Sequence, residues 1–221
     1  MVKKYPYLIG DFMWTAWDYL GEVGIGAWSY TREGRRFDKP YPWLLADVGA
    51  IDILGNVGAE AAYAGIVWGM RKSPYSGVRP VNHSGEALNK SVRRGTNAIE
   101  SWAWKGCEGN KATVEVYADA VKVELFLNGK SLGKKRIKNY KSIFKTKYAP
   151  GILMAVAYDS NGNKIGCTQL SSAIGSTQIL IQPEKDTIHA NEIVYLNISL
   201  AGENGVVESN ADQKLHVTVE G

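Results

Sequence analysis

A tight turn at Asn128-Gly129 is the feature that most constrains what this chain can fold into. The residues before it, 121–127, place apolar side chains at every second position. Such alternation is typical of a strand with one buried face. Asn-Gly supplies the pair of positive φ angles that a tight turn between antiparallel strands requires. The sequence therefore predicts a β-hairpin here.

Further segments repeat this strand pattern in the same part of the chain. They span 112–117, 143–148, 151–159 and 164–170. Asn161-Gly162 supplies another hairpin turn, and about six antiparallel strands are enough for a two-sheet sandwich. A later group has its strands at 177–182, 193–200 and 215–220. That later group has too few strands to close a core of its own, so we expect the start of a further sandwich domain.

The first third of the chain mixes helix and strand signals. Residues 58–68 are rich in alanine and fit a partly amphipathic helix of about three turns. A long irregular stretch, 21–57, precedes this helix, and loops of that length in compact domains are usually functional. Segment 72–80 contains two prolines, a glycine and two serines, which is a linker composition. We therefore place a domain boundary near residue 76.

Charge and cysteine usage argue against several function classes. The chain has 221 residues, a net charge of +4 and 45% hydrophobic residues, which is an ordinary globular composition. The basic run 130–147 falls on and beside the hairpin, where a solvated outer face explains it without nucleic acid. No apolar run reaches the roughly 18 residues of a membrane helix. Cys107 and Cys167 fit neither a disulfide framework nor a zinc site, so we expect buried free thiols and no metal or cofactor.

Segment 9–22 carries the side chains that a sugar site needs. It runs an apolar, aromatic strand into Trp17, Asp18 and Glu22. In barrels and open α/β sheets, the substrate binds at the carboxyl ends of the strands. Indole faces stack on the apolar face of a pyranose, and carboxylates accept its hydroxyl protons. A core strand followed by a polar turn has the same composition, so the residues alone leave both interpretations open.

Four stretches together resemble the carboxyl-terminal part of glycoside hydrolase family two, the β-galactosidase and β-glucuronidase group. They are FMWTAWDYLGE from Phe12, DILGN from Asp52 with a helix ending IVWG, SWAWKGCEG from Ser101, and VEVYADAVKVELFLNGKSLG from Val114. The resemblance implies a mainly β fold, with immunoglobulin-like β-sandwiches preceded by the last strand and helix of a (β/α)8 barrel. Residues 1–75 would end the barrel, 76–172 would form a sandwich with its linker, and 173–221 would begin another sandwich domain.

The resemblance also assigns site residues. It places 10–17 on strand eight of the barrel, Trp14 on the floor of the sugar subsite, and Asp18 and Glu22 directly after it. Family members hydrolyse β-glycosides with retention through two glutamates about 5 Å apart. Those glutamates follow strands four and seven, and would therefore precede Met1. The implied substrate-binding residues are Trp14, Asp18 and Glu22, and no catalytic residue is expected in this chain.

Three functions remain open from the sequence. The first is part of a retaining exo-β-glycosidase, β-galactosidase-like because the Asn-Lys-Lys-Gly run of β-glucuronidases is absent. The second is a carbohydrate-binding sandwich that uses Trp102, Trp104 or Tyr117, although the alternation of the two tryptophans favours the core. The third is a structural sandwich without a ligand.

Partners follow from the first of these functions. A carbohydrate substrate is expected for the whole enzyme, with no nucleic acid and no membrane. An incomplete barrel would expose the four tryptophans of its segment, Trp14, Trp17, Trp28 and Trp43. Such a surface needs cover, so we expect a homo-oligomer formed through this region or cover from the sandwich.

Overall fold

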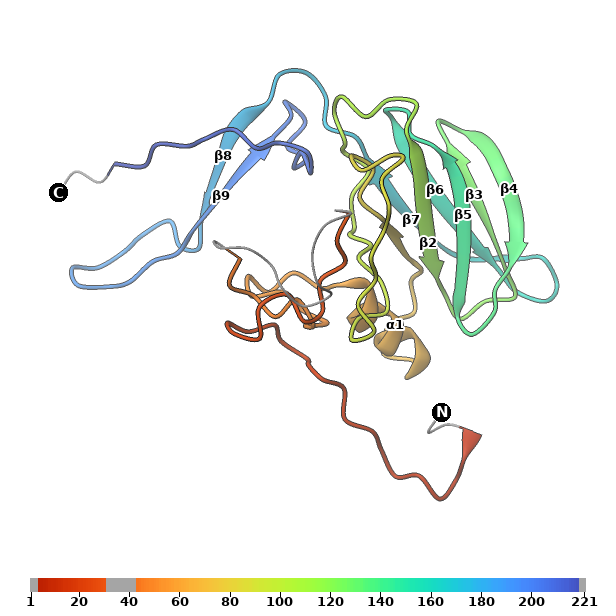
Figure 1. The fold of residues 1–221 in the computed structure, drawn as a ribbon. Helices are drawn as coiled ribbons and strands as arrows, with labels where there is room; N and C mark the ends of the chain where they lie inside the picture. Colours follow the sequence, from red (N-terminus) through yellow and green to blue (C-terminus); the bar gives the residue numbers. More distant parts are fainter. Residues whose placement is uncertain (1–3, 31–42, 219–221) are drawn as a thin grey trace.

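The computed structural model describes residues 4–30 and 43–218, which form a mainly β protein (Figure 1). The described elements are α1 (Ala59–Val67), β1 (Tyr75–Val78), β2 (Lys111–Tyr117), β3 (Lys122–Leu127), β4 (Lys130–Arg136), β5 (Lys141–Lys147), β6 (Ile152–Tyr158), β7 (Lys164–Ser171), β8 (Gln178–Pro183) and β9 (Leu196–Ala201). Within those residues, no helix has the length and apolar character needed to span a bilayer.

Strands β1 to β7 form a sandwich of two antiparallel sheets. One sheet has the order β1-β2-β5 and the other the order β4-β3-β6-β7. Val114 and Val116 on β2 face Val123 and Leu125 on β3 across one core that includes Trp102. Burying each large apolar side chain contributes about 1.5 to 3 kcal/mol. The mainly β sandwich predicted from the alternating strands is confirmed.

The predicted hairpin between β3 and β4 is confirmed in detail. Asn128 and Gly129 have φ angles of 50° and 77°, and Leu127 pairs with Lys130 across the turn. The Asn128 side chain also accepts a hydrogen bond from the backbone N of Ile152 at 2.8 Å. The turn is therefore fixed both by its own backbone and by the start of β6.

Segment 72–80 is not a linker, contrary to the expectation from its composition. Tyr75–Val78 forms β1, which pairs antiparallel with β2, and all of its residues are buried. A strand that is buried on both faces does not alternate apolar and polar residues, so its sequence lacks the pattern that predicts a strand. Pro74 and Pro80 flank the strand, where the missing N–H removes no ladder hydrogen bond.

Helix α1 packs at the end of the β1-β2-β5 sheet where β1 begins and β2 ends (Figure 1). Its Ala62 and Ile66 are buried against Tyr75 and Tyr117. Gly69, with a φ of 74°, ends the helix because it adopts the left-handed conformation that closes a last turn. The helix expected over 58–68 is confirmed.

Residues 10–17 form no strand, contrary to the expectation from the resemblance. Trp17 makes a single parallel bridge with Ile51. A strand needs a neighbour along its length, and the described residues offer no such neighbour to 9–14. Ile9 and Phe12 are accordingly fully exposed.

Strands β8 and β9 form a hairpin beside the sandwich (Figure 1). The following turn attaches this hairpin: the backbone N of Ser209 donates to the Ala103 carbonyl at 3.0 Å, and the buried Glu208 accepts from the backbone N of Lys105 at 3.1 Å. The strand expected at 215–220 is absent from 215–218, and its last two residues lie outside the described part.

Candidate functional site

Trp14 and Glu22, two of the expected site residues, meet through Tyr19. The indole Nε1 of Trp14 donates to the Tyr19 hydroxyl at 3.2 Å, and that hydroxyl donates to the Glu22 carboxylate. The Trp14 and Tyr19 rings meet edge to face, with centroids 6.2 Å apart. The carboxylate of Glu22 raises the pKa of the Tyr19 hydroxyl because it accepts a hydrogen bond from the protonated form. An exposed indole and a carboxylate therefore stand together at one place.

Asp18, the third expected residue, is directed away from that pair. Its carboxylate accepts hydrogen bonds from the backbone N atoms of Asp47, Val48 and Gly49 at 3.1 to 3.2 Å. Three amide donors satisfy most of what a carboxylate can accept. Asp18 therefore holds the 47–49 loop, a contact between residues about thirty positions apart that no local sequence signal indicates.

Two glycines let this loop approach the site closely. A Cβ atom on Gly26 would lie 2.0 Å from the Asp47 carbonyl oxygen, and one on Gly49 would lie 2.3 Å from the backbone N of Asp18. Both distances are well below any allowed contact, so a side chain at either position would force the two backbones apart. The irregular stretch 21–57 is thus packed against the site in its described parts.

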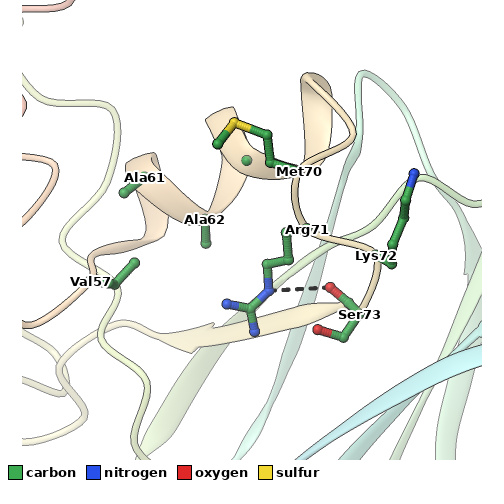
Figure 2. A pocket seen from close by; sticks show the side chains of 8 residues that line it. Val57, Ala61, Ala62, Met70, Arg71, Lys72 and Ser73 are labelled. Carbon is green, nitrogen blue, oxygen red and sulfur yellow. Dashed lines mark hydrogen bonds between the residues drawn. The ribbon is translucent and has the colours of Figure 1, made fainter.

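A separate hollow of about 660 Å³ lies where α1 ends (Figure 2). It is lined by Val57, Ala61, Ala62, Gly65, Met70, Arg71, Lys72 and Ser73. Figure 2 shows the Arg71 guanidinium group turned toward Ser73, whose carbonyl oxygen accepts from Nε at 3.2 Å. The lining residues include neither a carboxylate nor a histidine. The hollow therefore lacks the pair of carboxyl groups that retaining glycoside hydrolysis uses.

The aromatic residues of the sandwich belong to its core. Trp102, Trp104 and Tyr117 are at most 4% exposed. The Trp102 indole donates to the Ala149 carbonyl at 3.0 Å and packs edge to face on Tyr148. The core interpretation of the two tryptophans is confirmed, and the exposed aromatic row required for carbohydrate binding by this sandwich is not formed.

The cysteines and basic residues make no site of their own. Cys107 is buried, which raises the pKa of its thiol, whereas Cys167 on β7 is exposed, contrary to the expectation of two buried thiols. Lys134 lies 3.6 Å from the centre of the Tyr158 ring and pairs with Glu124. In the part of the chain described, no cluster of three or more possible metal ligands occurs.

The chain is similar to known proteins both in sequence and in fold. Residues 109–166 match a family model described as "Domain of unknown function (DUF4982)". The whole chain is 25% identical to "Beta-galactosidase BoGH2A" of Bacteroides ovatus, of which it covers 22%.

Solved structures extend this likeness. A glycosyl hydrolase family 2 member from Bacteroides cellulosilyticus is 32% identical, with a TM-score of 0.75, over 93% of this chain and 27% of that one. A second member from the same organism is 28% identical with a TM-score of 0.67. The chain spans about a quarter of the length of these relatives. In sequence and in fold, the chain is therefore similar to a part of glycoside hydrolase family 2 members.

Proposed function

We propose that this chain is part of a retaining exo-β-glycosidase that acts on β-galactosides, and that it supplies sugar-binding side chains but no catalytic carboxylate. The observation that carries the proposal is the Trp14–Tyr19–Glu22 arrangement, which presents an indole face 71% exposed beside a hydrogen-bonded carboxylate. An indole and a carboxylate placed together can stack on a sugar ring and accept its hydroxyl protons. The β-galactosidase of Bacteroides ovatus among the relatives supports the choice of sugar.

The exposed apolar surface of the first segment supports a place within a larger barrel. Ile9, Phe12 and Trp17 are 105%, 101% and 58% exposed. Several large apolar side chains exposed within one short segment indicate an interaction site rather than a solvent-facing one. In the proposed enzyme, neighbouring strands of a (β/α)8 barrel cover it.

The strand order supports the proposed domain plan. A β1-β2-β5 sheet facing a β4-β3-β6-β7 sheet, with chain crossings between the sheets, is consistent with an immunoglobulin-like sandwich for residues 76–172. Residues 1–75 then end the barrel and residues 173–221 begin a further sandwich. The alternative role, a structural spacer without a ligand, is supported for the sandwich itself by the burial of Trp102, Trp104 and Tyr117.

Neither acidic residue of the site is a suitable catalyst. Retaining hydrolysis needs two carboxyl groups about 5 Å apart, one as nucleophile and one as acid and base, both facing the bond that is cleaved. Asp18 is bound by three backbone amides, and Glu22 is bound by Tyr19. We therefore expect the catalytic pair to be contributed from outside this chain.

The test compares this chain with the complete reading frame that contains it, using a nitrophenyl β-galactoside. The purified chain should show no turnover, and the longer protein should hydrolyse the substrate with retention of anomeric configuration. Turnover by the chain alone that is abolished by Asp18→Asn or Glu22→Gln would overturn the proposal. Hydrolysis of a β-glucuronide in preference to the β-galactoside by the longer protein would overturn the choice of sugar.

A further inference from the structure

We propose that Arg94 is a positioning residue for the sugar site. Arg94 binds Asp47, Asp47 binds Asp18, and Asp18 precedes Tyr19 of the site. The proposal rests on the proposed function for what the site binds. The positioning itself is a property of this chain and can be measured without any substrate.

Arg94 joins three separate segments. Its guanidinium group forms an ion pair with the Asp47 carboxylate and lies 3.9 Å from the Glu60 carboxylate at the start of α1. Its backbone carbonyl accepts a hydrogen bond from the Trp28 indole at 3.2 Å. The Arg94 side chain is 16% exposed, so these contacts are largely shielded from water. The charge has two acidic partners, and removing it would leave both carboxylates without this cation.

Asp47 links Arg94 to the site through its side chain and its backbone. Its φ angle is 60°, a conformation that residues other than glycine adopt at an energetic cost. The ion pair to Arg94 holds the Asp47 side chain, and the same residue's backbone N donates to the Asp18 carboxylate. Asp18 is followed directly by Tyr19, whose hydroxyl lies between Trp14 and Glu22.

The segment that bears Arg94 is itself anchored on both sides. Toward the site, Ser91 Oγ donates to the Ile25 carbonyl at 2.6 Å. Toward α1, the backbone N of Thr96 donates to Glu60 at 2.9 Å, and toward the sandwich Ile99 and Val78 exchange two backbone hydrogen bonds. Residues 91–99 therefore form a strap between the sandwich and the site, with Arg94 at its centre.

The first experiment measures amide hydrogen exchange in the 221-residue chain by NMR. In Arg94→Met, the amides of Asp47, Val48 and Gly49 should exchange roughly tenfold faster, because the loop that presents them to Asp18 has lost its anchor. Amides of β3 and β6 should be unchanged. Arg94→Lys should restore part of the protection from exchange, since lysine keeps the charge. It lacks the planar set of donors with which arginine can bind two carboxylates at once.

Two further variants make the result decisive. The matched control is Arg93→Met, a neighbouring exposed arginine, which should leave the 47–49 amides unchanged. If Arg94→Met unfolds the sandwich, Asp47→Asn removes the same ion pair while Arg94 keeps Glu60, and the same amides are measured. Unchanged exchange at 47–49 in Arg94→Met, or in Asp47→Asn where the first variant unfolds, overturns the proposal.

The second experiment uses the longer enzyme. Arg94→Met should raise KM for a nitrophenyl β-galactoside roughly tenfold and change kcat less than threefold, because a displaced sugar floor weakens binding in ground state and transition state alike. Arg94→Lys should recover part of the KM. A fall in kcat at unchanged KM would indicate loss of folded enzyme and would contradict a positioning role. If the longer wild-type protein hydrolyses no β-glycoside, the proposed function fails, while the exchange measurement still decides the role of Arg94.

Discussion

Glu115 on β2 and Lys141 on β5 form an ion pair of 2.8 Å in which the glutamate side chain has no exposed area. Arg79 lies 2.6 Å from the same carboxylate, and the Tyr117 hydroxyl donates to it at 2.5 Å. Burial alone raises the pKa of Glu115, but the hydrogen bonds from Lys141, Tyr117 and Arg79 outweigh it and hold the pKa below its usual value. The carboxylate therefore stays charged although it is fully buried in the β1-β2-β5 sheet.

Replacing Glu115 by glutamine should destabilise the chain by about 3 kcal/mol, because two partly buried cations then lose their anion. The free energy of unfolding in urea measures this cost. Glu124→Gln is the control, since its partner Lys134 is 3.7 Å away and more exposed, and its loss should cost less than about 1 kcal/mol. Equal costs for the two variants would contradict the special role of Glu115.

The stabilisation from Glu115 should depend on pH in one direction. Its pKa is lower in the folded state than the ordinary value near 4.5, so the carboxylate stabilises the fold above that pH and loses its contribution as the pH falls through the folded pKa. The stability difference between wild type and Glu115→Gln should be constant near neutral pH and shrink below about pH 4. A difference that grows on acidification would have the wrong sign.

Substitutions of Trp14 and Trp102 should have different effects: Trp14→Ala should impair sugar binding, whereas Trp102→Ala should impair stability. Trp102 is fully buried, so Trp102→Ala should cost about 3 to 5 kcal/mol of unfolding free energy, whereas Trp14→Ala should cost less than about 0.5 kcal/mol. In the longer enzyme, Trp14→Ala should lower kcat/KM about a hundredfold, or roughly 3 kcal/mol. If Trp102→Ala is more damaging to catalysis in equally folded enzyme, the sandwich and not Trp14 contacts the sugar.

Gly129→Val should destabilise the chain by about 1 to 3 kcal/mol through the backbone alone. The position has a φ of 77°, and nothing lies within 4 Å of the Cβ that the substitution adds. Lys130→Val introduces the same side chain at the first residue of β4 and is the control, which should be close to neutral. Thermal unfolding of both variants provides the measurement, and an unchanged midpoint for Gly129→Val would contradict the turn geometry.

The isolated chain should self-associate through its first segment, because Ile9 and Phe12 are fully exposed. Sedimentation velocity should show a concentration-dependent shift to larger species. The double variant Ile9→Ser, Phe12→Ser should reduce that shift, while the exposed pair Lys164→Ser, Lys145→Ser should not. A wild-type chain that remains monomeric at high concentration would show that this surface is satisfied without a partner.

The sandwich could be predicted because its strands carry their own signals. The alternation along β3 and the Asn128-Gly129 turn are local patterns, and the structure follows both of them. Strand β1 could not be predicted in this way. Its Gly77 reads as a turn residue but lies in close packing, where a Cβ would be 3.0 Å from that of Ala98.

The site was only partly accessible to sequence reasoning. Resemblance placed Trp14, Asp18 and Glu22 near one another, but it gave no sign that Tyr19 joins two of them while the third turns toward the 47–49 loop. The role of Arg94 could not be predicted from the sequence, because Arg94 and Asp47 are 47 positions apart and meet only in the folded chain.

The close approach at Gly26 and Gly49 has a consequence for mutagenesis of the proposed sugar site. Because each glycine lies against the backbone of the opposite loop, the loops at 18–27 and 45–51 cannot be varied independently. A library that randomises either glycine will be dominated by variants whose added side chain collides with the opposite backbone. Productive diversity requires both loops to be exchanged together as a matched pair taken from one homologue, with the two glycines kept.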